Sequence, residues 1–183
     1  MRVIRQGAFE TNSSSSHTMV LKNPNSGIVV PDLSNYDVKT DYEDESIKYV
    51  FVRQREYCGG DDILNDWLSK AEYLVAMVLM CTKNIYYNTK ELNESEDMKP
   101  IQDAVKEVLG IEIRCTGDIS VSKYDYGEED GKMYMLHDAY IDHESVYDSM
   151  EDFMQKYGKD YNKEDVKDIL FNPSWEINII YAS

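Results

Sequence analysis

Apolar side chains that recur at intervals of three and four residues dominate the stretch between Ile63 and Leu79. They are Ile63, Leu64, Trp67, Leu68, Ala71, Leu74, Val75, Val78 and Leu79. This spacing places them on one face of an α-helix, which turns once in about 3.6 residues. Asp61 and Asp62 stand just before the pattern, where an aspartate can cap the first turn. The sequence therefore predicts a long amphipathic helix over residues 62–82, whose apolar face other elements must cover.

Shorter elements surround this helix in blocks of strands and blocks of helices. Helical spacing recurs in residues 99–109, 145–157 and 163–170, and Gly110 is expected to end the first of these. Short apolar or alternating runs predict strands over residues 2–5, 18–21, 27–30, 47–52, 111–115, 119–124, 132–136 and 175–181. A Thr-Gly-Asp turn separates residues 111–115 from residues 119–124, which favours a hairpin between them.

Strands and helices that come in blocks, without strict alternation, are typical of an α+β fold. We therefore expect a largely antiparallel sheet packed against the long amphipathic helix and two or three shorter helices. A chain of 183 residues fits one domain over residues 1–183. Residues 110–117 are the place where a subdivision would fall.

The charge of the chain is strongly negative and unevenly spread. The sequence has 35 acidic and 19 basic residues, a net charge of −16, and residues 118–183 hold 16 acidic and 6 basic ones. A field of this sign repels nucleic acid and attracts basic surfaces. We therefore expect no free DNA as a ligand, and expect a basic nucleic-acid-binding protein as the partner. The alternative is an acidic surface that serves only solubility.

The cysteines and the absence of familiar motifs restrict the compartment and the kinds of cofactor and partner that we expect. Cys58, Cys81 and Cys115 are odd in number and widely spaced, so they form neither a disulfide framework nor a Cys-x-x-Cys pair. This usage fits a reducing compartment, and we expect the cytosol of a host cell. No apolar run approaches membrane-spanning length, so we expect no membrane partner. No phosphate-binding or dinucleotide-binding glycine motif occurs, and no cofactor is expected.

The first candidate site is the serine loop, residues 5–17, with the sequence RQGAFETNSSSSH. Its candidate catalytic residues are Arg5, Glu10, Asn12, Ser13, Ser14, Ser15 and His17. In RNA cleavage His17 would act as base, Arg5 would hold the phosphate and Glu10 would orient His17. Asn12 and the serines would donate to the oxyanion, and no metal is obligatory because the 2′-hydroxyl of RNA can attack. The alternative is a structural loop, since Ser, Thr and Asn side chains readily bond their own backbone.

A second, weaker cluster lies between residues 137 and 143. His137, Asp138, Asp142 and His143 offer the imidazole and carboxylate groups that bind divalent cations. Five residues between the two histidines suit neither a helical nor a strand ligand geometry. A polar loop is the alternative interpretation, and we predict no metal site elsewhere.

The pattern R-x-G-x-F-E-T-N-S-S-S-S-H over residues 5–17 resembles an N-terminal signature of small proteins of phages and mobile elements. The resemblance continues through Tyr-Cys-Gly-Gly at residues 57–60 and Lys-Ala-Glu-Tyr-Leu at residues 70–74. Among proteins of this size and acidity, the resemblance suggests the type II anti-CRISPR class. It implies that the serine loop is a site, because the signature includes side chains as diverse as Arg, Glu, Asn and His.

The resemblance and the charge together suggest a counter-defence protein that engages a basic nucleic-acid enzyme, such as a Cas9-type effector with its guide RNA. In this hypothesis the serine loop acts as a metal-independent ribonuclease on the guide RNA. Two alternatives remain open. The protein could be a non-catalytic acidic mimic of DNA, or an element protein that acts on a small molecule.

Overall fold

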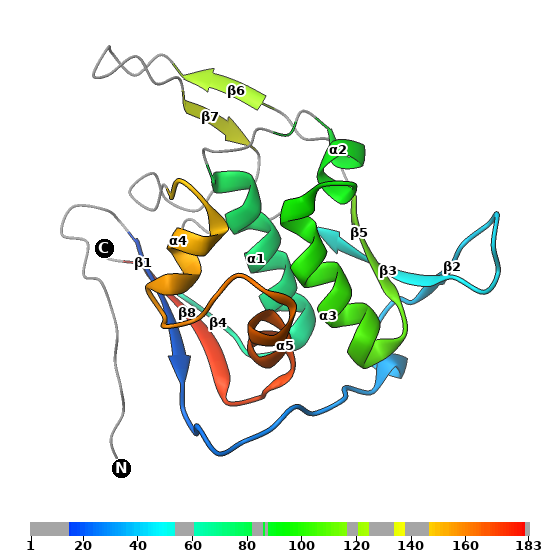
Figure 1. Ribbon diagram of the computed structural model, residues 1–183, viewed down its shortest axis with the longest axis horizontal. Coiled ribbons are helices and arrows are strands. Elements are labelled where there is room, and N and C mark those ends of the chain that lie inside the picture. Colours follow the sequence, from blue (N-terminus) through cyan, green and yellow to red (C-terminus); the bar gives the residue numbers. More distant parts are fainter. Residues whose placement is uncertain are drawn as a thin grey trace.

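The computed structural model describes residues 15–53, 61–81, 86, 88–116, 121–124, 134–137 and 147–181. For residues 15, 16, 121–124, 134–137 and 181 it describes the backbone only. Figure 1 shows α1 (Trp67–Met80) in the middle of the fold, beside α3 (Lys99–Leu109) and α5 (Lys163–Phe171). The α+β class expected from the sequence is confirmed.

The first sheet brings together strands that lie far apart in the sequence. Its order is β1-β8-β4, with β1 (Ser15–Leu21), β8 (Trp175–Tyr181) and β4 (Asp62–Leu64). β8 pairs with both β1 and β4, so it is the central strand, and both pairings are antiparallel. The side chains of β8 alternate between the two faces, and the core face carries the buried Trp175, Ile177 and Ile179.

The second sheet has the order β2-β3-β5, with β2 (Lys39–Thr40), β3 (Lys48–Arg53) and β5 (Glu112–Thr116). β3 pairs with β2 antiparallel and with β5 parallel. The side chain of Asn93 covers the outer edge of β5: its Oδ1 accepts from the Cys115 N–H at 2.8 Å and its Nδ2 donates to the Cys115 carbonyl at 3.2 Å. This bond pair protects the sheet edge from pairing with another chain.

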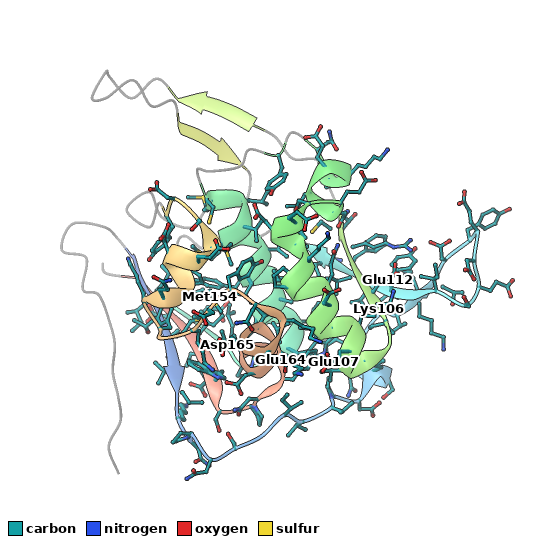
Figure 2. All side chains as sticks on the ribbon, in the orientation of Figure 1. Lys106, Glu107, Glu112, Met154, Glu164 and Asp165 are labelled. Carbon is teal, nitrogen blue, oxygen red and sulfur yellow. The ribbon has the colours of Figure 1, made fainter. Side chains whose placement is uncertain are left out.

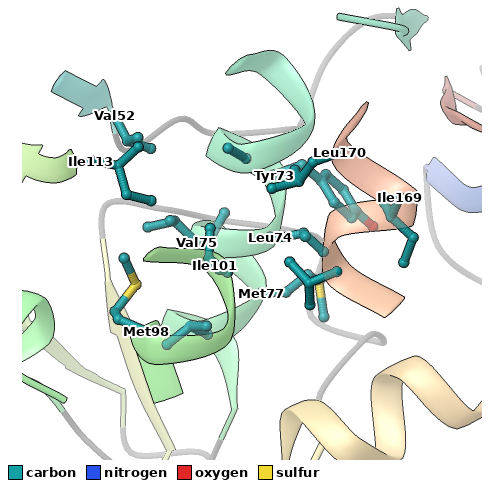
Figure 3. Packing of buried hydrophobic residues seen from close by; sticks show 14 of the residues in the cluster. Val52, Tyr73, Leu74, Val75, Met77, Met98, Ile101, Ile113, Ile169 and Leu170 are labelled. Carbon is teal, nitrogen blue, oxygen red and sulfur yellow. The ribbon is translucent and has the colours of Figure 1, made fainter. Parts of the chain in front are cut away.

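Helix α1 is shorter than the sequence suggested and is not amphipathic. Residues 62–64 form β4, because their pairing with β8 satisfies their backbone, and Asp66 caps the helix by accepting from the N–H groups of Leu68 and Ser69 at 3.0 Å. Nearly every side chain of α1 is buried, including the charged Lys70 and Glu72. Figure 3 shows α1 side chains lying between those of α3 and α5. A central helix covered on all sides follows from this packing.

Of the other predicted helices, residues 99–109 and 163–170 match α3 and α5, whereas the helix predicted over residues 145–157 is observed only as the shorter α4 (Met150–Gln155), and α2 (Thr89–Asn93) was not predicted. α3 ends at Gly110, whose φ of 67° is the left-handed conformation that glycine adopts readily, so the predicted stop is confirmed. The other helical segments are η1 (Leu33–Asn35) and η2 (Glu96–Met98). The side chains of Asn88, Ser149 and Asn162 cap α2, α4 and α5 by accepting from backbone N–H groups.

Two strand predictions are wrong. β5 does not form a hairpin with the next strand: it pairs with β3, and β6 (Val121–Tyr124) pairs with β7 (Tyr134–His137). The alternation in β5 serves to bury Ile113 and Cys115 on one face of the second sheet. Residues 27–30 are not a strand, although the Val29 N–H donates to the Phe171 carbonyl at 2.9 Å. Predicted strand 2–5 lies outside the described residues.

Ion pairs join the exposed sides of α3 and α5. Glu107 of α3 lies 2.5 Å from the Nζ of Lys163 and 2.6 Å from that of Lys167, and Glu164 lies 2.5 Å from Lys167. Figure 2 shows Glu107 and Glu164 close together on this side of the molecule. Hydrogen bonds from the two lysines lower the pKa of Glu107 to about 2. The folded protein therefore holds this carboxylate ionised in acid more strongly than an unfolded chain does.

Glu107→Gln is expected to remove part of the acid dependence of stability. A carboxylate whose pKa is lowered contributes stability above its unfolded pKa of 4.5, and that contribution is lost as the pH falls toward 2. Urea unfolding of the wild type and the variant should therefore show a gap that is present near pH 6 and closes toward pH 2. A gap that stays constant over this range would contradict the ion-pair assignment.

Candidate functional site

The structure places the end of the serine loop inside a strand. β1 begins at Ser15, so Ser15, Ser16 and His17 pair with Tyr181, Ile180 and Ile179 of β8. The predicted strand over residues 18–21 is confirmed and begins three residues earlier than expected. The assignment of Ser15 and His17 to a loop is therefore corrected, because the antiparallel ladder with β8 fixes their backbone. The other candidates, Arg5, Glu10, Asn12, Ser13 and Ser14, lie outside the described residues.

The imidazole of His17 lies on the core face of the first sheet and is partly buried. Its ring stacks on that of Tyr73 in α1, with centroids 5.9 Å apart and planes inclined by 25°. The backbone carbonyl of His17 accepts from the Tyr157 hydroxyl at 3.4 Å. Contacts from α1 to the ring and from the turn after α4 to the backbone thus position His17.

Aromatic rings extend this contact into the His17 cluster, which we define as His17, Tyr73, Tyr147, Phe153 and Tyr157. Phe153 lies at its centre, with ring centroids 6.3 Å from Tyr73, 5.3 Å from Tyr147 and 5.5 Å from Tyr157. Phe153 meets Tyr147 and Tyr157 edge to face, at 72° and 67°, a geometry that stabilises aromatic pairs beyond the area that they bury. The cluster therefore holds His17 in one orientation.

A cation lies at the edge of the His17 cluster. The Nζ of Lys156 donates to the Tyr147 hydroxyl at 2.8 Å and lies 4.2 Å from the centre of its ring. An imidazole can transfer protons near neutral pH and an ammonium group can hold an anion. The described part of the cluster thus has an imidazole on Tyr73 and an ammonium group on Tyr147.

Two of the three segments that carry the sequence resemblance are in contact here, through His17 and Tyr73. Tyr73, the stacking partner of His17, belongs to the Lys-Ala-Glu-Tyr-Leu stretch of α1. In the same stretch, Lys70 Nζ donates to the carbonyls of Asn172 and Trp175, both at 3.3 Å, and Glu72 accepts from the Arg53 N–H at 3.3 Å. Residues 70–74 therefore connect α1 to the second sheet at Arg53, to the start of β8 at Trp175, and to β1 at His17.

The sequence singled out residues 70–74 through the resemblance, but it assigned no contact to Lys70, Glu72 or Tyr73. Lys70 is only 1% exposed, and burial lowers the pKa of its amine to about 8 against the opposing influence of Asp66, Asp168 and Glu176. The available signal was a lysine and a glutamate within a run of apolar residues. Charged groups are rarely buried unless they are paired, so such a position indicates a specific contact.

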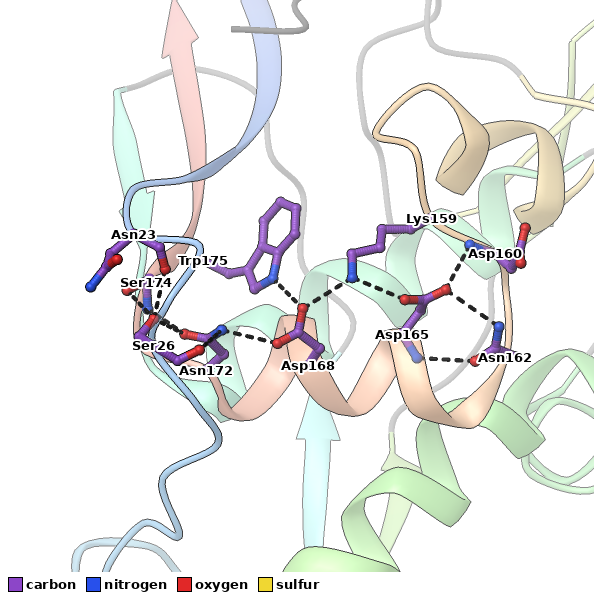
Figure 4. A network of polar contacts seen from close by, with 10 residues as sticks. All are labelled: Asn23, Ser26, Lys159, Asp160, Asn162, Asp165, Asp168, Asn172, Ser174 and Trp175. Carbon is purple, nitrogen blue, oxygen red and sulfur yellow. Dashed lines mark hydrogen bonds and ion pairs between the residues drawn. The ribbon is translucent and has the colours of Figure 1, made fainter. Parts of the chain in front are cut away.

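A polar network links α5 to the start of β8 (Figure 4). Asp168 is its centre: one carboxylate oxygen accepts from Trp175 Nε1 at 2.8 Å and Lys159 Nζ at 3.0 Å, and the other accepts from Asn172 Nδ2 at 2.9 Å. Asn172 is 2% exposed, and its Oδ1 in turn accepts from the Ser26 hydroxyl at 2.7 Å. Because every member is bonded within the chain, we assign this network a structural role.

The predicted metal cluster is represented in the structure by one residue. His137 is the last residue of β7, where its backbone pairs with Val121, whereas Asp138, Asp142 and His143 lie outside the described residues. In the part of the chain that the structure describes, no group of three His, Cys, Asp or Glu side chains is arranged to hold a metal ion.

The charged surface is the remaining feature of functional interest. Many of the basic side chains lie within 4.0 Å of a carboxylate, namely those of Lys22, Lys39, Lys90, Lys99, Lys106, Arg114, Lys159, Lys163 and Lys167. By contrast, Glu43, Glu45 and Asp103 are exposed carboxylates that form no ion pair with another described residue. Ion pairs within the described part of the chain therefore engage many of the basic side chains, whereas these three carboxylates stay exposed to solvent.

No protein-family model, curated protein or solved structure matches the chain. Among the described helices, none combines the length and the apolar character needed to cross a bilayer.

Proposed function

We propose that the protein binds a basic protein surface of the kind that normally holds nucleic acid, and that it is a counter-defence protein of a phage or mobile element. A Cas9-type effector with its guide RNA is the partner that we test first. The observation that supports this proposal is the internal pairing of the basic side chains in a chain of net charge −16. Such a surface attracts a positively charged channel.

The β2–β3 hairpin is the part of the acidic surface best placed for docking. Figure 1 shows it extending away from the helices. Its turn carries Glu43, Asp44 and Glu45 beside Tyr42, whose side chain is fully exposed at 100%. Tyrosine is enriched among the residues that contribute most to protein interfaces, and flanking carboxylates would steer it toward a basic surface.

Binding to a Cas9–guide complex is expected to block cleavage of target DNA. The association should weaken as salt is raised, because it depends on exposed charges. The double variant Glu43→Lys, Glu45→Lys should bind more weakly than Asp103→Lys, which changes a comparable unpaired carboxylate on α3. Pull-down and DNA cleavage assays over a salt series measure both effects. Undiminished DNA cleavage and no complex at low salt would contradict the proposal for this partner.

Cleavage of the guide RNA by the serine loop stays a prediction of the sequence. The structure contributes one favourable observation, that Tyr73 and Tyr157 hold His17 in a fixed orientation. Guide RNA incubated with the protein in the effector complex would be examined on a denaturing gel. Shortened RNA that disappears with His17→Ala supports cleavage. Intact RNA together with blocked DNA cutting supports the non-catalytic mimic.

A further inference from the structure

The second sheet has a face that points away from the core. Along β3, Val50 and Val52 are buried on the core side, whereas Tyr49, Phe51 and Arg53 point to the opposite side. The parallel register with β5 places Glu112, Arg114 and Thr116 beside these three residues. We call these six residues the outer face. Phe51 is 39% exposed there, which is unusual for a phenylalanine in a central strand.

The charge of this sheet is opposite to that of the chain. Its three strands carry four basic residues, Lys39, Lys48, Arg53 and Arg114, and one acidic residue, Glu112. The strands of the first sheet carry no lysine or arginine and two acidic residues, Asp62 and Glu176. The excess of basic residues is confined to the strands, because Arg114 is paired with carboxylates and the turn between β2 and β3 carries Asp41, Glu43, Asp44 and Glu45.

Aromatic and guanidinium groups on the outer face are held in a fixed arrangement. The Cζ of Arg114 lies 4.1 Å from the centre of the Tyr49 ring, and Tyr49 meets Phe51 edge to face at 5.2 Å. Asp41 and Glu112 bind the Arg114 guanidinium at 2.5 and 3.2 Å. Two carboxylates thus balance the charge of Arg114 and hold its guanidinium over the Tyr49 ring. Tyr49 in turn packs against the exposed ring of Phe51.

Arg53 is the cation of the outer face that remains available. Its backbone N–H is bound by Glu72, which anchors the end of β3 to α1. Its side chain is exposed and forms no ion pair with any residue in the described ranges. An exposed aromatic ring and a guanidinium thus stand two positions apart on the same side of one strand.

We infer that the outer face binds single-stranded nucleic acid, with one base stacked on Phe51 and the adjoining phosphate against Arg53. Exposed sheet surfaces that combine aromatic rings with basic side chains bind single strands in this way, because every base offers a flat ring. A protein interface, in which aromatic residues and arginine are also enriched, is the alternative occupant that the test distinguishes. This activity does not depend on the proposed docking onto a basic protein.

The test uses the full chain and naked oligonucleotides. Fluorescence anisotropy would measure binding of labelled single-stranded RNA and DNA of about twelve nucleotides. Phe51→Leu keeps an apolar side chain but removes the ring, and it should weaken binding roughly tenfold, as expected for one lost stacking contact. Arg53→Gln should make the logarithmic salt slope shallower by about 0.7, the value for one phosphate of a single strand. The RNA and DNA arms show whether the 2′-hydroxyl contributes.

Ile63→Ala is the matched control, because Ile63 is also exposed on a strand, at 59%, but in the first sheet. It should leave the affinity unchanged, and circular dichroism would confirm that each variant is folded. Absence of binding by the wild type, or equal binding by folded Phe51→Leu, overturns the inference. If Phe51→Leu instead weakens docking onto the effector complex while naked strands do not bind, the face is a protein interface. If docking fails while strands bind, the inference stands without the proposed function.

Discussion

Replacing Asp168 with asparagine is expected to lower the free energy of unfolding by about 2–3 kcal/mol. Asparagine has nearly the same shape, but it presents an amide N–H₂ where a carboxylate oxygen now accepts hydrogen bonds. Trp175 Nε1, Lys159 Nζ and Asn172 Nδ2 all donate to Asp168. At least one of these donors would face another donor, and Trp175 and Asn172 are only 5% and 2% exposed. A buried donor without an acceptor loses its hydration and gains nothing in return.

Chemical unfolding of the wild type and the variant at neutral pH measures this effect. Asp103→Asn is the matched control, since it makes the same chemical change at an exposed position of α3 and should alter stability by less than about 0.5 kcal/mol. Equal stabilities of the two variants would show that the network centred on Asp168 does not hold the start of β8.

Lys70→Met is expected to remove an alkaline rise in stability. The pKa of Lys70 falls from 10.5 in an unfolded chain to about 8 in the folded protein. Between these two values the unfolded chain binds more protons than the folded one, so the free energy of unfolding increases with pH. The cost of burying the charged amine is present in full below pH 8 and is relieved as the pH rises toward 10.5. A shift of this size corresponds to about 3–4 kcal/mol.

The measured quantity is the difference in unfolding free energy between wild type and variant at several values between pH 7 and 10.5. Other groups, tyrosines above all, titrate in this range, and their contributions cancel in the difference. The difference should change in favour of the wild type as the pH rises. Lys90→Met at an exposed lysine of α2, whose side chain is 82% exposed, should show no such trend. A flat difference for Lys70→Met would mean that its amine keeps an ordinary pKa.

The sequence predicted elements well where one local signal decided the outcome. The helix over residues 99–109, its stop at Gly110 and the strand over residues 175–181 match α3 and β8. The predicted start of α1 was wrong, because Asp61 and Asp62 stood at the predicted N-terminus whereas a third aspartate, Asp66, is the cap. Pairing of residues 62–64 with a strand far along the chain decided between them, and no local pattern reports such a partner.

The same limit applies to the candidate site. Alternation in β5 correctly indicated a strand with one buried face, but the choice of β3 as its neighbour depends on how α3 returns the chain. The serine loop and residues 70–74 were both singled out by sequence, yet the contact between His17 and Tyr73 follows only from the fold. The sequence did not indicate Phe51 as a candidate, because a phenylalanine in a strand is normally buried and its exposure is known only from the fold.

The position of β8 has a consequence for synthesis on the ribosome. β1 and β4 emerge long before β8, the strand that both of them need, so neither can complete its hydrogen bonding until the last of the three is translated. Contacts between such distant segments slow folding, and the waiting strands have open edges in the meantime. Mutual repulsion between nascent copies of so acidic a polypeptide would keep those edges apart until the sheet closes.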